Sequence, residues 1–479
     1  MTIQPKLRFL TATAGAALLL ASCAVGPKAP DATLPPSASG AFIGSQSAAV
    51  SPDVARDDWW RLYSDPVLDG LVQQALTNNN ELEAAAANLR RVRAALGEAR
   101  VGRFPSTTTS AAYQRSRPSA ATLPPGTLPP GTEAPETDTY DAGLDVAYEI
   151  DLFGRVESTV RAARADADAA AAALDIVRVA VAAETARAYA DACSGNAQIA
   201  VAERTIELQS NTVDLTQRLL DGGAGNGLDT SRARAALETT RASLPPLLAQ
   251  RDGALFRLAT LTGVTPAEAS QAARVCARPP QLTQPIPVGD GAALLARRPD
   301  VRQAERNLAA AAARVNVATA DLYPRISLGG SLGATALDGG GLGDSENFRF
   351  SFGPLISWSF PNVFAARARI EQAGAGSDAA LATFDQTVLV ALQETETALA
   401  NYANELDRRS ALQAARDQAA NAARLSRLRF DAGADSFLTV LDAERTLASA
   451  DAQLASSDAL VTTYQIALFK ALAGGWSEG

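Results

Sequence analysis

Residues 301–324, VRQAERNLAAAAARVNVATADLYP, align with residues 82–105, LEAAAANLRRVRAALGEARVGRFP, from the first half of the chain. Both stretches are rich in alanine, the strongest helix former, and each stops at an aromatic residue followed by proline. A direct repeat of this size predicts two similar halves in a pseudo-symmetric arrangement. Each half is expected to run helix, strand, loop, strand, long helix, turn and long helix.

A second pair of matching segments places the turns between the long helices. Residues 220–224, LDGGA, correspond to residues 430–434, FDAGA. On this basis the first repeat is predicted over residues 66–264 and the second over 292–473. Residues 265–291 are expected to form a linker between them, and residues 474–479 a C-terminal tail.

The strand candidates follow the prolines that end the first helix of each half. Alternating apolar and polar residues predict strands near 106–116 and 140–151 in the first half, and near 325–335 and 348–360 in the second. Their length of about ten residues crosses a bilayer as a tilted strand. Alternation with aromatic residues is typical of a membrane barrel, although a soluble sheet with one buried face has the same pattern.

The connecting loops favour the barrel. Residues 117–139 are rich in proline and threonine, residues 336–347 are rich in glycine, and neither composition suits a packed core. Four strands cannot close a barrel, and open sheet edges are not tolerated in lipid. The sequence therefore predicts a homotrimer with a twelve-stranded barrel, four strands from each copy.

The segment from residue 155 to about residue 220 lacks proline and carries apolar residues at alternating steps of four and three. Half of residues 161–192 are alanine. This spacing predicts long helices that pack closely along a coiled-coil seam, and the same spacing returns after residue 381. At 1.5 Å per residue the first helix would reach roughly 100 Å.

The N-terminus indicates export and lipid attachment. Lys6 and Arg8 precede an apolar run, and residues 20–23 read LASC. Residues 1–22 are therefore predicted to be a signal peptide, because the apolar run is too short for a membrane anchor. The tetrapeptide is similar to a lipoprotein lipobox, which implies acylation of Cys23 and a lipid-anchored segment over residues 23–65; a plain signal peptide is the alternative.

Cys193 and Cys276 are the other two cysteines of the chain. In an exported protein, two remaining cysteines predict a disulfide, with two buried free thiols as the alternative. A catalytic thiol is not expected, because the chain has no histidine to activate it.

The composition disfavours several other functions. The net charge of −9 is unfavourable for binding nucleic acid, and the missing histidines remove the commonest general base and metal ligand. The glycine-rich segments at residues 221–226 and 338–341 lack the spacing of calcium or phosphate loops. We expect no enzyme activity, no metal site and no cofactor.

Taken together, these motifs resemble the TolC-like outer-membrane factor family, in its lipoprotein, NodT- or OprM-like branch. The most specific match is RFDAG at residues 429–433, followed by FLTVLDAER at residues 437–445. The resemblance implies an α+β membrane protein in which a trimeric outer-membrane β-barrel continues into a long α-helical periplasmic barrel. It also implies the exit duct of an efflux or export system, with an adaptor protein and an inner-membrane pump as partners.

The resemblance assigns roles to the two helix turns. Leu438, Asp442 and Arg445 share one helix face and would form a gate around the trimer axis. The alternative is an ordinary Asp442–Arg445 surface pair beside a core leucine. The tips would dock the adaptor through five residues: Arg218, Gly223, Leu228, Arg429 and Gly433.

A lipid-anchored structural or adhesive coiled-coil protein of the periplasm is the competing interpretation of the long helices. The aromatic alternation at residues 348–360 separates the two hypotheses, because a coiled coil has no use for it. The cargo and the class of the pump are not encoded in any motif that we identify.

Overall fold

The computed structural model describes residues 25–30, 32–124, 126–127, 129, 131–282, 284–359 and 363–473. The chain divides into two compact units. The sheet unit contains the N-terminal segment up to Ala32, Arg90–Ala169 and Glu305–Thr383. The helix unit contains Thr33–Leu89, Ala170–Ala304 and the chain from Phe384 onward. Each unit is therefore built from both halves of the sequence.

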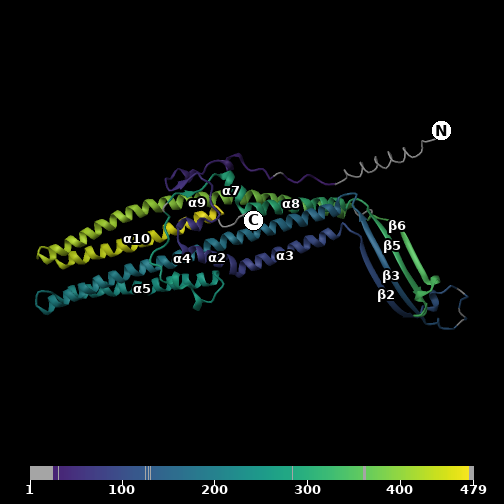
Figure 1. Ribbon diagram of the computed structural model, residues 1–479, viewed down its shortest axis with the longest axis horizontal. Helices are drawn as coiled ribbons and strands as arrows, with labels where there is room; N and C mark the ends of the chain where they lie inside the picture. Colours follow the sequence, from purple (N-terminus) through teal and green to yellow (C-terminus); the bar gives the residue numbers. More distant parts are fainter. Residues whose placement is uncertain are drawn as a thin grey trace. The chain divides into compact units, whose positions relative to one another are not determined.

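The same succession of elements occurs twice (Figure 1). The first half contains α3 (Asn80–Val101), β2 (Ser106–Ser116), β3 (Thr137–Ile150), α4 (Arg155–Asp221) and α5 (Gly227–Leu261). The second half contains α8 (Pro299–Ala320), β5 (Arg325–Ala336), β6 (Phe348–Ser357), α9 (Val363–Asp431) and α10 (Phe437–Ala471). In addition, α2 (Pro66–Asn78) precedes α3, and α7 (Gly291–Arg297) precedes α8.

The sheet has four antiparallel strands in the order β2-β3-β5-β6. The central pairing joins the two halves, with Leu144 of β3 opposite Leu332 of β5, which in turn lies opposite Phe350 of β6. Strands β2 and β6 form the two edges. Within this unit, α3 and α8 precede β2 and β5, and α4 and α9 follow β3 and β6. All four helices join the sheet at the same end, which we call the helix end of the sheet.

The strand register separates an apolar face of the sheet from a polar face. The apolar face carries aromatic and aliphatic side chains from all four strands, although threonine takes two of the positions on the edge strand β2. Its members are Thr107, Thr109, Ala111 and Tyr113; Tyr140, Ala142, Leu144, Val146, Tyr148 and Ile150; Ile326, Leu328, Leu332 and Ala334; and Phe348, Phe350, Phe352 and Ile356.

The strand boundaries differ from the prediction at two places. Strand β3 begins at Thr137, earlier than the expected residue 140, because its polar first residues pair with the end of β2. Strand β6 ends at Ser357 rather than residue 360, which lies outside the described residues. The predicted signal peptide, Cys23 and the C-terminal tail also lie outside them.

Helix α4 extends over 67 residues without interruption, and the predicted seam is buried along it. In the helix unit, Leu174 and Val181 of α4 pack with Leu82 and Leu89 of α3. In the sheet unit, Val160 of α4 packs with Leu96 of α3 in the same register, together with partly buried alanines. The small side chains allow close approach of the helices, as the composition indicates.

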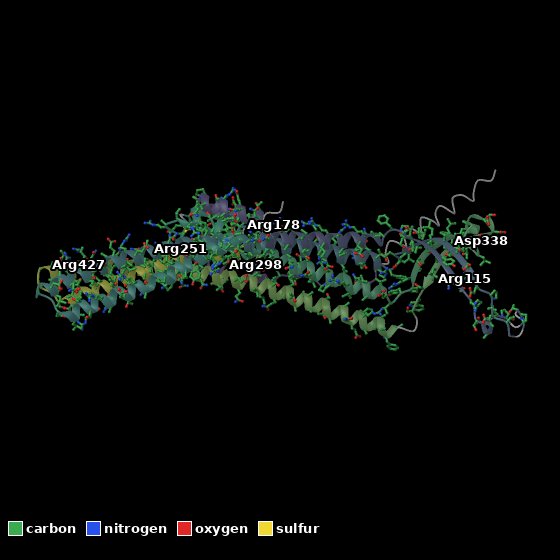
Figure 2. All side chains as sticks on the ribbon, turned by 90° about the horizontal axis from the view of Figure 1, so that it is seen from below. Arg115, Arg178, Arg251, Arg298, Asp338 and Arg427 are labelled. Atoms are coloured by element: carbon green, nitrogen blue, oxygen red, sulfur yellow. A yellow bond between two sulfur atoms is a disulfide. The ribbon has the colours of Figure 1, made fainter. Side chains whose placement is uncertain are left out.

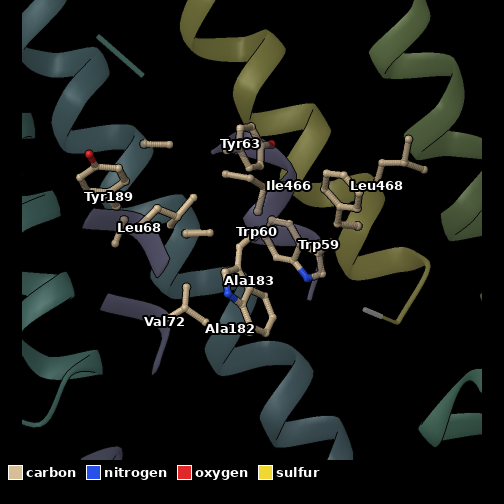
Figure 3. Close-up of a cluster of buried hydrophobic side chains, with 14 of the residues drawn as sticks. Trp59, Trp60, Tyr63, Leu68, Val72, Ala182, Ala183, Tyr189, Ile466 and Leu468 are labelled. Atoms are coloured by element: carbon tan, nitrogen blue, oxygen red, sulfur yellow. The ribbon is translucent and has the colours of Figure 1, made fainter. Parts of the chain in front are cut away.

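The main core of the helix unit collects aromatic residues from the N-terminal segment (Figure 3). Trp59 stacks on Phe469 of α10 at a ring-centroid distance of 4.7 Å, and Trp60 and Tyr63 are buried beside it. Farther along, Asp65 caps α2 by accepting from the backbone N–H of Val67 at 2.8 Å. The segment before α2 is thus a structural part of the unit.

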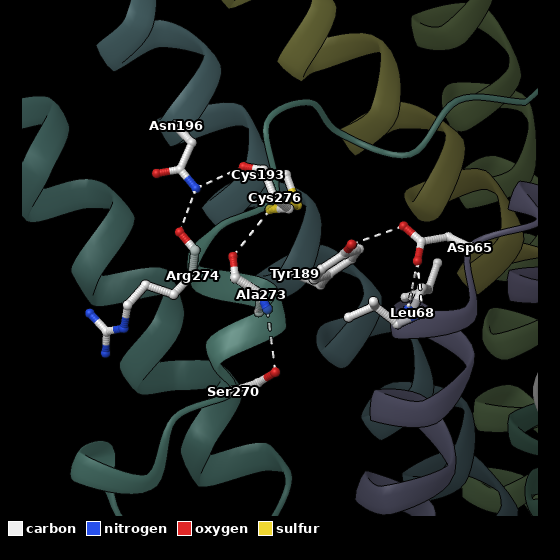
Figure 4. The surroundings of a disulfide bond; sticks show 10 residues. Asp65, Leu68, Tyr189, Cys193, Asn196, Ser270, Ala273, Arg274 and Cys276 are labelled. Carbon is white, nitrogen blue, oxygen red and sulfur yellow. Dashed lines mark hydrogen bonds between the residues drawn. A yellow bond between two sulfur atoms is a disulfide. The ribbon is translucent and has the colours of Figure 1, made fainter.

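The segment between the repeats is held by a short strand pair and a disulfide. Strand β4 (Ile286–Pro287) pairs in parallel with β1 (Val50–Ser51). Cys276 is joined to Cys193 of α4, with a Cα–Cα distance of 5.2 Å (Figure 4). The amide of Asn196 donates to the carbonyl oxygens of Arg274 and Cys276 at 3.0 and 2.8 Å. The described residues of the predicted linker therefore belong to the helix unit.

None of the helices in the described part of the chain combines the length and the hydropathy needed to traverse a bilayer.

Candidate functional site

The two tip turns, which connect α4 to α5 and α9 to α10, have the same backbone geometry. Gly223 and Gly433 each adopt a φ of +73°, a conformation that favours glycine. In the second turn, the N–H of Gly433 donates to Phe430 O and that of Ala434 to Arg429 O, both at 2.8 Å. The first turn has the equivalent pair of bonds. Both helices therefore end in a Schellman motif, as the aligned sequences indicate.

The second tip is closed by an ion pair. The guanidinium of Arg429 contacts both carboxylate oxygens of Asp435, with Nε–Oδ2 at 2.8 Å and Nη2–Oδ1 at 3.0 Å. The hydrogen bond that Arg429 donates to the Asp435 carboxylate raises the pKa of Arg429 above its usual value. Ser436 occupies the N-cap of α10, but its side chain makes no capping bond. Helix α10 therefore begins without a side-chain cap, because the Asp435 carboxylate binds Arg429 and the Ser436 hydroxyl lies beside that of Thr439.

The first tip is capped differently. Asn226 accepts from the backbone N–H of Asp229 at 2.9 Å and so begins α5. Arg218 and Leu228 are exposed on either side of the turn. Arg218 donates to the carbonyl oxygen of Asp214 at 3.3 Å but makes no ion pair among the described residues, so the first tip presents a cation without a counter-charge and an apolar side chain to the solvent.

The three residues that we predict to form a gate lie on the exposed face of α10. Leu438 is 49% exposed, and Asp442 and Arg445 are also exposed. The helix is fixed by its opposite face, where Phe437 and Leu441 are buried. Within the described chain, neither Asp442 nor Arg445 forms an ion pair, so the expected alternative of an i,i+3 surface pair is not realised.

Sequence reasoning missed a polar clasp that joins three helices near the tips. Arg427 of α9 forms an ion pair with Glu444 of α10 and donates to the hydroxyl of Thr212 on α4 at 2.9 Å. The same hydroxyl lies 3.0 Å from Glu444 Oε2. Arg427 lies close to the turns, whereas Arg251 and Arg298 lie farther along the same unit (Figure 2). Thr212 is 1% exposed, so the clasp ties α4 to the second helix pair.

The polar face of the sheet has its own ion pair. Arg349 of β6 reaches across β5 to Asp141 of β3, with Nη2–Oδ2 at 2.8 Å. Thr335 of the intervening strand donates to the same carboxylate at 2.7 Å. Three strands are thereby connected through side chains on this face.

The apolar face is open to its surroundings. Phe350 and Phe352 are each 76% exposed, and Ile356 is 66% exposed. Contiguous apolar area of this extent marks a surface that contacts lipid or protein. An exposed apolar face combined with two unpaired edge strands is the arrangement expected of a sheet that lies in a membrane.

Comparison with known proteins identifies the family. The sequence model of the outer membrane efflux protein family matches residues 71–264 and 292–474. The chain belongs to the outer membrane efflux protein family. This is a family of transport channels rather than enzymes, and the resemblance noted from the tip motifs is confirmed.

The relatives of this outer membrane efflux protein match over nearly their whole length. It is 32% identical to the outer membrane protein OprJ of Pseudomonas aeruginosa over 97% of this chain and 95% of OprJ. It is also 32% identical to the antibiotic efflux pump outer membrane protein ArpC of Pseudomonas putida, over 98% of this chain and 96% of ArpC. The chain is accordingly an efflux exit channel of the outer membrane.

Solved structures have the same fold. The outer-membrane channel OprN superimposes with a TM-score of 0.87 at 37% identity, covering 95% of this chain and all of that one. The Neisseria gonorrhoeae MtrE outer membrane channel gives a TM-score of 0.80 at 26% identity, with 95% of this chain and 98% of MtrE covered. Membership of a channel family decides against the alternative of an adhesive coiled-coil protein.

Proposed function

We propose that three copies of this chain form a continuous duct, in which the sheets close a twelve-stranded barrel and the helices extend it into the periplasm. The exposed apolar face of the open sheet carries this proposal. Edge strands leave backbone N–H and C=O groups unpaired, and lipid cannot satisfy them. Pairing β2 of one copy with β6 of the next removes both edges, and the strands of 10–14 residues are long enough to cross a bilayer.

In this arrangement the polar face lines the lumen. The Arg349–Asp141 pair lies on that face, whereas the phenylalanines of β6 lie on the other. Polar groups on a lumen surface remain hydrated, and apolar groups on the outside contact hydrocarbon. The assignment of the two faces therefore follows from free energies of transfer, because exposing the polar face to hydrocarbon or the apolar face to water would be unfavourable.

The proposed periplasmic gate is the exposed face of α10. Leu438, Asp442 and Arg445 are held on that face by the buried Phe437 and Leu441 on the other. Around a threefold axis, their copies would form one apolar ring and one charged ring. We propose that these rings close the resting duct, and that substrates pass without energy input once the rings separate.

Both tips are proposed to dock a periplasmic adaptor, which connects the duct to an inner-membrane pump. Arg218 and Leu228 of the first tip and Arg429 of the second are exposed near turns in which Gly223 and Gly433 adopt a positive φ. A helix pair with an exposed end suits recognition by another helical hairpin.

We also propose that Cys23 is acylated and anchors the chain in the outer membrane. Cys23 lies outside the described residues, but Val25 donates its N–H to the carbonyl of Phe153 at 3.5 Å, beside the helix end of the sheet. Gly26 follows with a φ of +139°, and an added Cβ would lie 2.0 Å from Oδ1 of Asn316. A side chain at this position would push the anchor segment away from α8.

Gel electrophoresis tests the proposed barrel. Unheated samples of the purified protein in SDS should migrate as a trimer and boiled samples as a monomer. Cysteines placed on the two edge strands, Thr109→Cys with a scan of single β6 positions, should cross-link copies into dimers and trimers. A monomer in every unheated sample, without cross-links at any register, would refute the shared barrel.

A further inference from the structure

A cavity of about 280 Å³ lies at the helix end of the sheet, between the start of β5 and the end of β6. Its lining differs from that of the neighbouring apolar face, because besides the carboxylate of Asp321 it combines two arginines, two aromatic side chains and two serines. These are Arg325, Arg369, Tyr323, Trp358, Ser357 and Ser359.

The charge balance of the cavity is positive. Arg325 is neutralised by Asp321, with Nη2–Oδ1 at 2.7 Å. Arg369 lines the same cavity and is exposed, and in the described part of the chain it has no carboxylate partner. One uncompensated guanidinium therefore faces a space that already contains hydroxyl donors. A guanidinium beside hydroxyl groups is a typical binding arrangement for a phosphate.

The side chains around the cavity indicate that its ligand is a lipid. Ile356 of the apolar face, which precedes Ser357 of the cavity, is 66% exposed, and Phe364, which follows Val363 of the cavity, is 82% exposed. Tyr323 stacks on Phe153 at 4.6 Å, and Trp358 donates its indole N–H to Leu322 O at 3.2 Å. Tyrosine and tryptophan side chains, which combine an apolar ring with a polar group, are characteristic of the level at which headgroups meet hydrocarbon.

We propose that this cavity binds the phosphate of an anionic membrane phospholipid, with Arg369 as its main contact. The acyl chains would lie on the apolar face beside Ile356. The inference rests on the proposed function, because it requires the helix end of the sheet to lie at a membrane surface. The lipid would connect the barrel rim to the start of α9 at the position where the N-terminal anchor segment also reaches the sheet.

The test uses the full mature protein in nanodiscs of phosphatidylethanolamine with a minority of phosphatidylglycerol. Native mass spectrometry counts the phosphatidylglycerol retained by the wild type, Arg369→Gln and the control Arg367→Gln. Arg367 is an exposed arginine two residues away that does not line the cavity. We expect retention to fall about tenfold in Arg369→Gln, as for loss of a charge-assisted hydrogen bond, and to stay unchanged in Arg367→Gln.

Three results would overturn the proposal. The first is equal retention in both variants and the wild type. The second is no enrichment of phosphatidylglycerol over the bulk lipid on the wild-type protein, a measurement that remains valid if a variant fails to fold. The third is complete displacement of the lipid by inorganic phosphate, which would make the cavity a site for the free anion. Conductance of the same wild-type sample tests the duct separately, since a silent protein that retains the lipid would refute only the channel.

Discussion

The hydroxyl of Thr212 on α4 lies 3.0 Å from Oε2 of Glu444 on α10, although the two residues are 232 positions apart. Arg427 of α9 completes the clasp by binding both of them. Because the clasp connects the first helix pair to the second, separation of the tips must break it. We therefore expect it to stabilise the closed state of the duct.

Thr212→Val should loosen the closed state. The substitution keeps the shape of the side chain and removes a hydrogen bond to charged groups, which contributes about 1.5–3 kcal/mol. The open fraction in single-channel recordings should rise by roughly tenfold or more. Thr216→Val is the matched control, because Thr216 is equally buried on the same helix and bonds only its own backbone, to Val213 O. Equal effects of both variants would show that the clasp has no part in closure.

Exchange of charges tests the Arg349–Asp141 pair on the polar face. Asp141→Asn or Arg349→Gln alone should lower the temperature at which the SDS-resistant trimer dissociates, because each leaves one partner without its counter-charge. The double variant Asp141→Arg with Arg349→Asp should recover part of the loss. If the trimer of the double variant dissociates at no higher temperature than that of either single variant, this ion pair does not help to set the strand register.

Removal of the disulfide should destabilise the helix unit. Cys193 and Cys276 enclose a long loop, for which the chain-entropy model gives a stabilisation of roughly 4 kcal/mol. The variant with both cysteines changed to serine should unfold at lower temperature and be cut by trypsin after Arg274. Peptide mass spectrometry without reduction should detect the linked pair in the wild type. Free thiols in that sample would show that the cross-link does not form in the cell.

A pH dependence is expected from Asp191 of α4. Burial, the largest effect, raises the pKa of this carboxyl group, with Glu184 adding to it and Arg187 and Arg257 opposing it. Because the folded pKa lies above the unfolded value, the stabilisation by the neutral acid is present below the unfolded pKa and is lost as pH rises through the folded pKa. The denaturant midpoint of Asp191→Asn should therefore match that of the wild type at about pH 3.5, near the usual aspartate pKa, and exceed it at about pH 7.

The exposed Asp214 of the same helix provides the control for this comparison. The variant Asp214→Asn removes the same charge from an exposed position, so it should not raise the denaturant midpoint at about pH 7 as Asp191→Asn does. A similar response of both variants would attribute the pH dependence to the overall charge of the chain.

Much of the fold could be predicted because its signals are local. Prolines after Phe104 and Tyr323 end the helices, and the alternation from Phe348 onward indicates a strand with two different faces. The glycines at 223 and 433 mark the turns, since the helices end with positive φ there. Each of these patterns depends on neighbours in the sequence and on elementary backbone geometry.

The clasp and the cavity at the helix end of the sheet could not be predicted in the same way. Thr212 and Arg427 are 215 positions apart and meet only because the two helix pairs pack with one relative rotation. An apolar seam indicates which face of a helix is buried, but it does not assign partners to the polar residues beside it. Arg369 has no local pattern that separates it from Arg367, and only the folded rim places one of them at the cavity.

Planar-bilayer conductance of the purified mature protein is the most direct test of the central claim that this chain forms a gated duct. It should be compared with the variant that combines Leu438→Ala, Asp442→Ala and Arg445→Ala. We predict a small conductance for the wild type and a sharp increase for the variant, because both rings at the proposed gate are removed. Large and equal conductance would move the constriction away from these residues, and silence from both correctly folded proteins would contradict the duct itself.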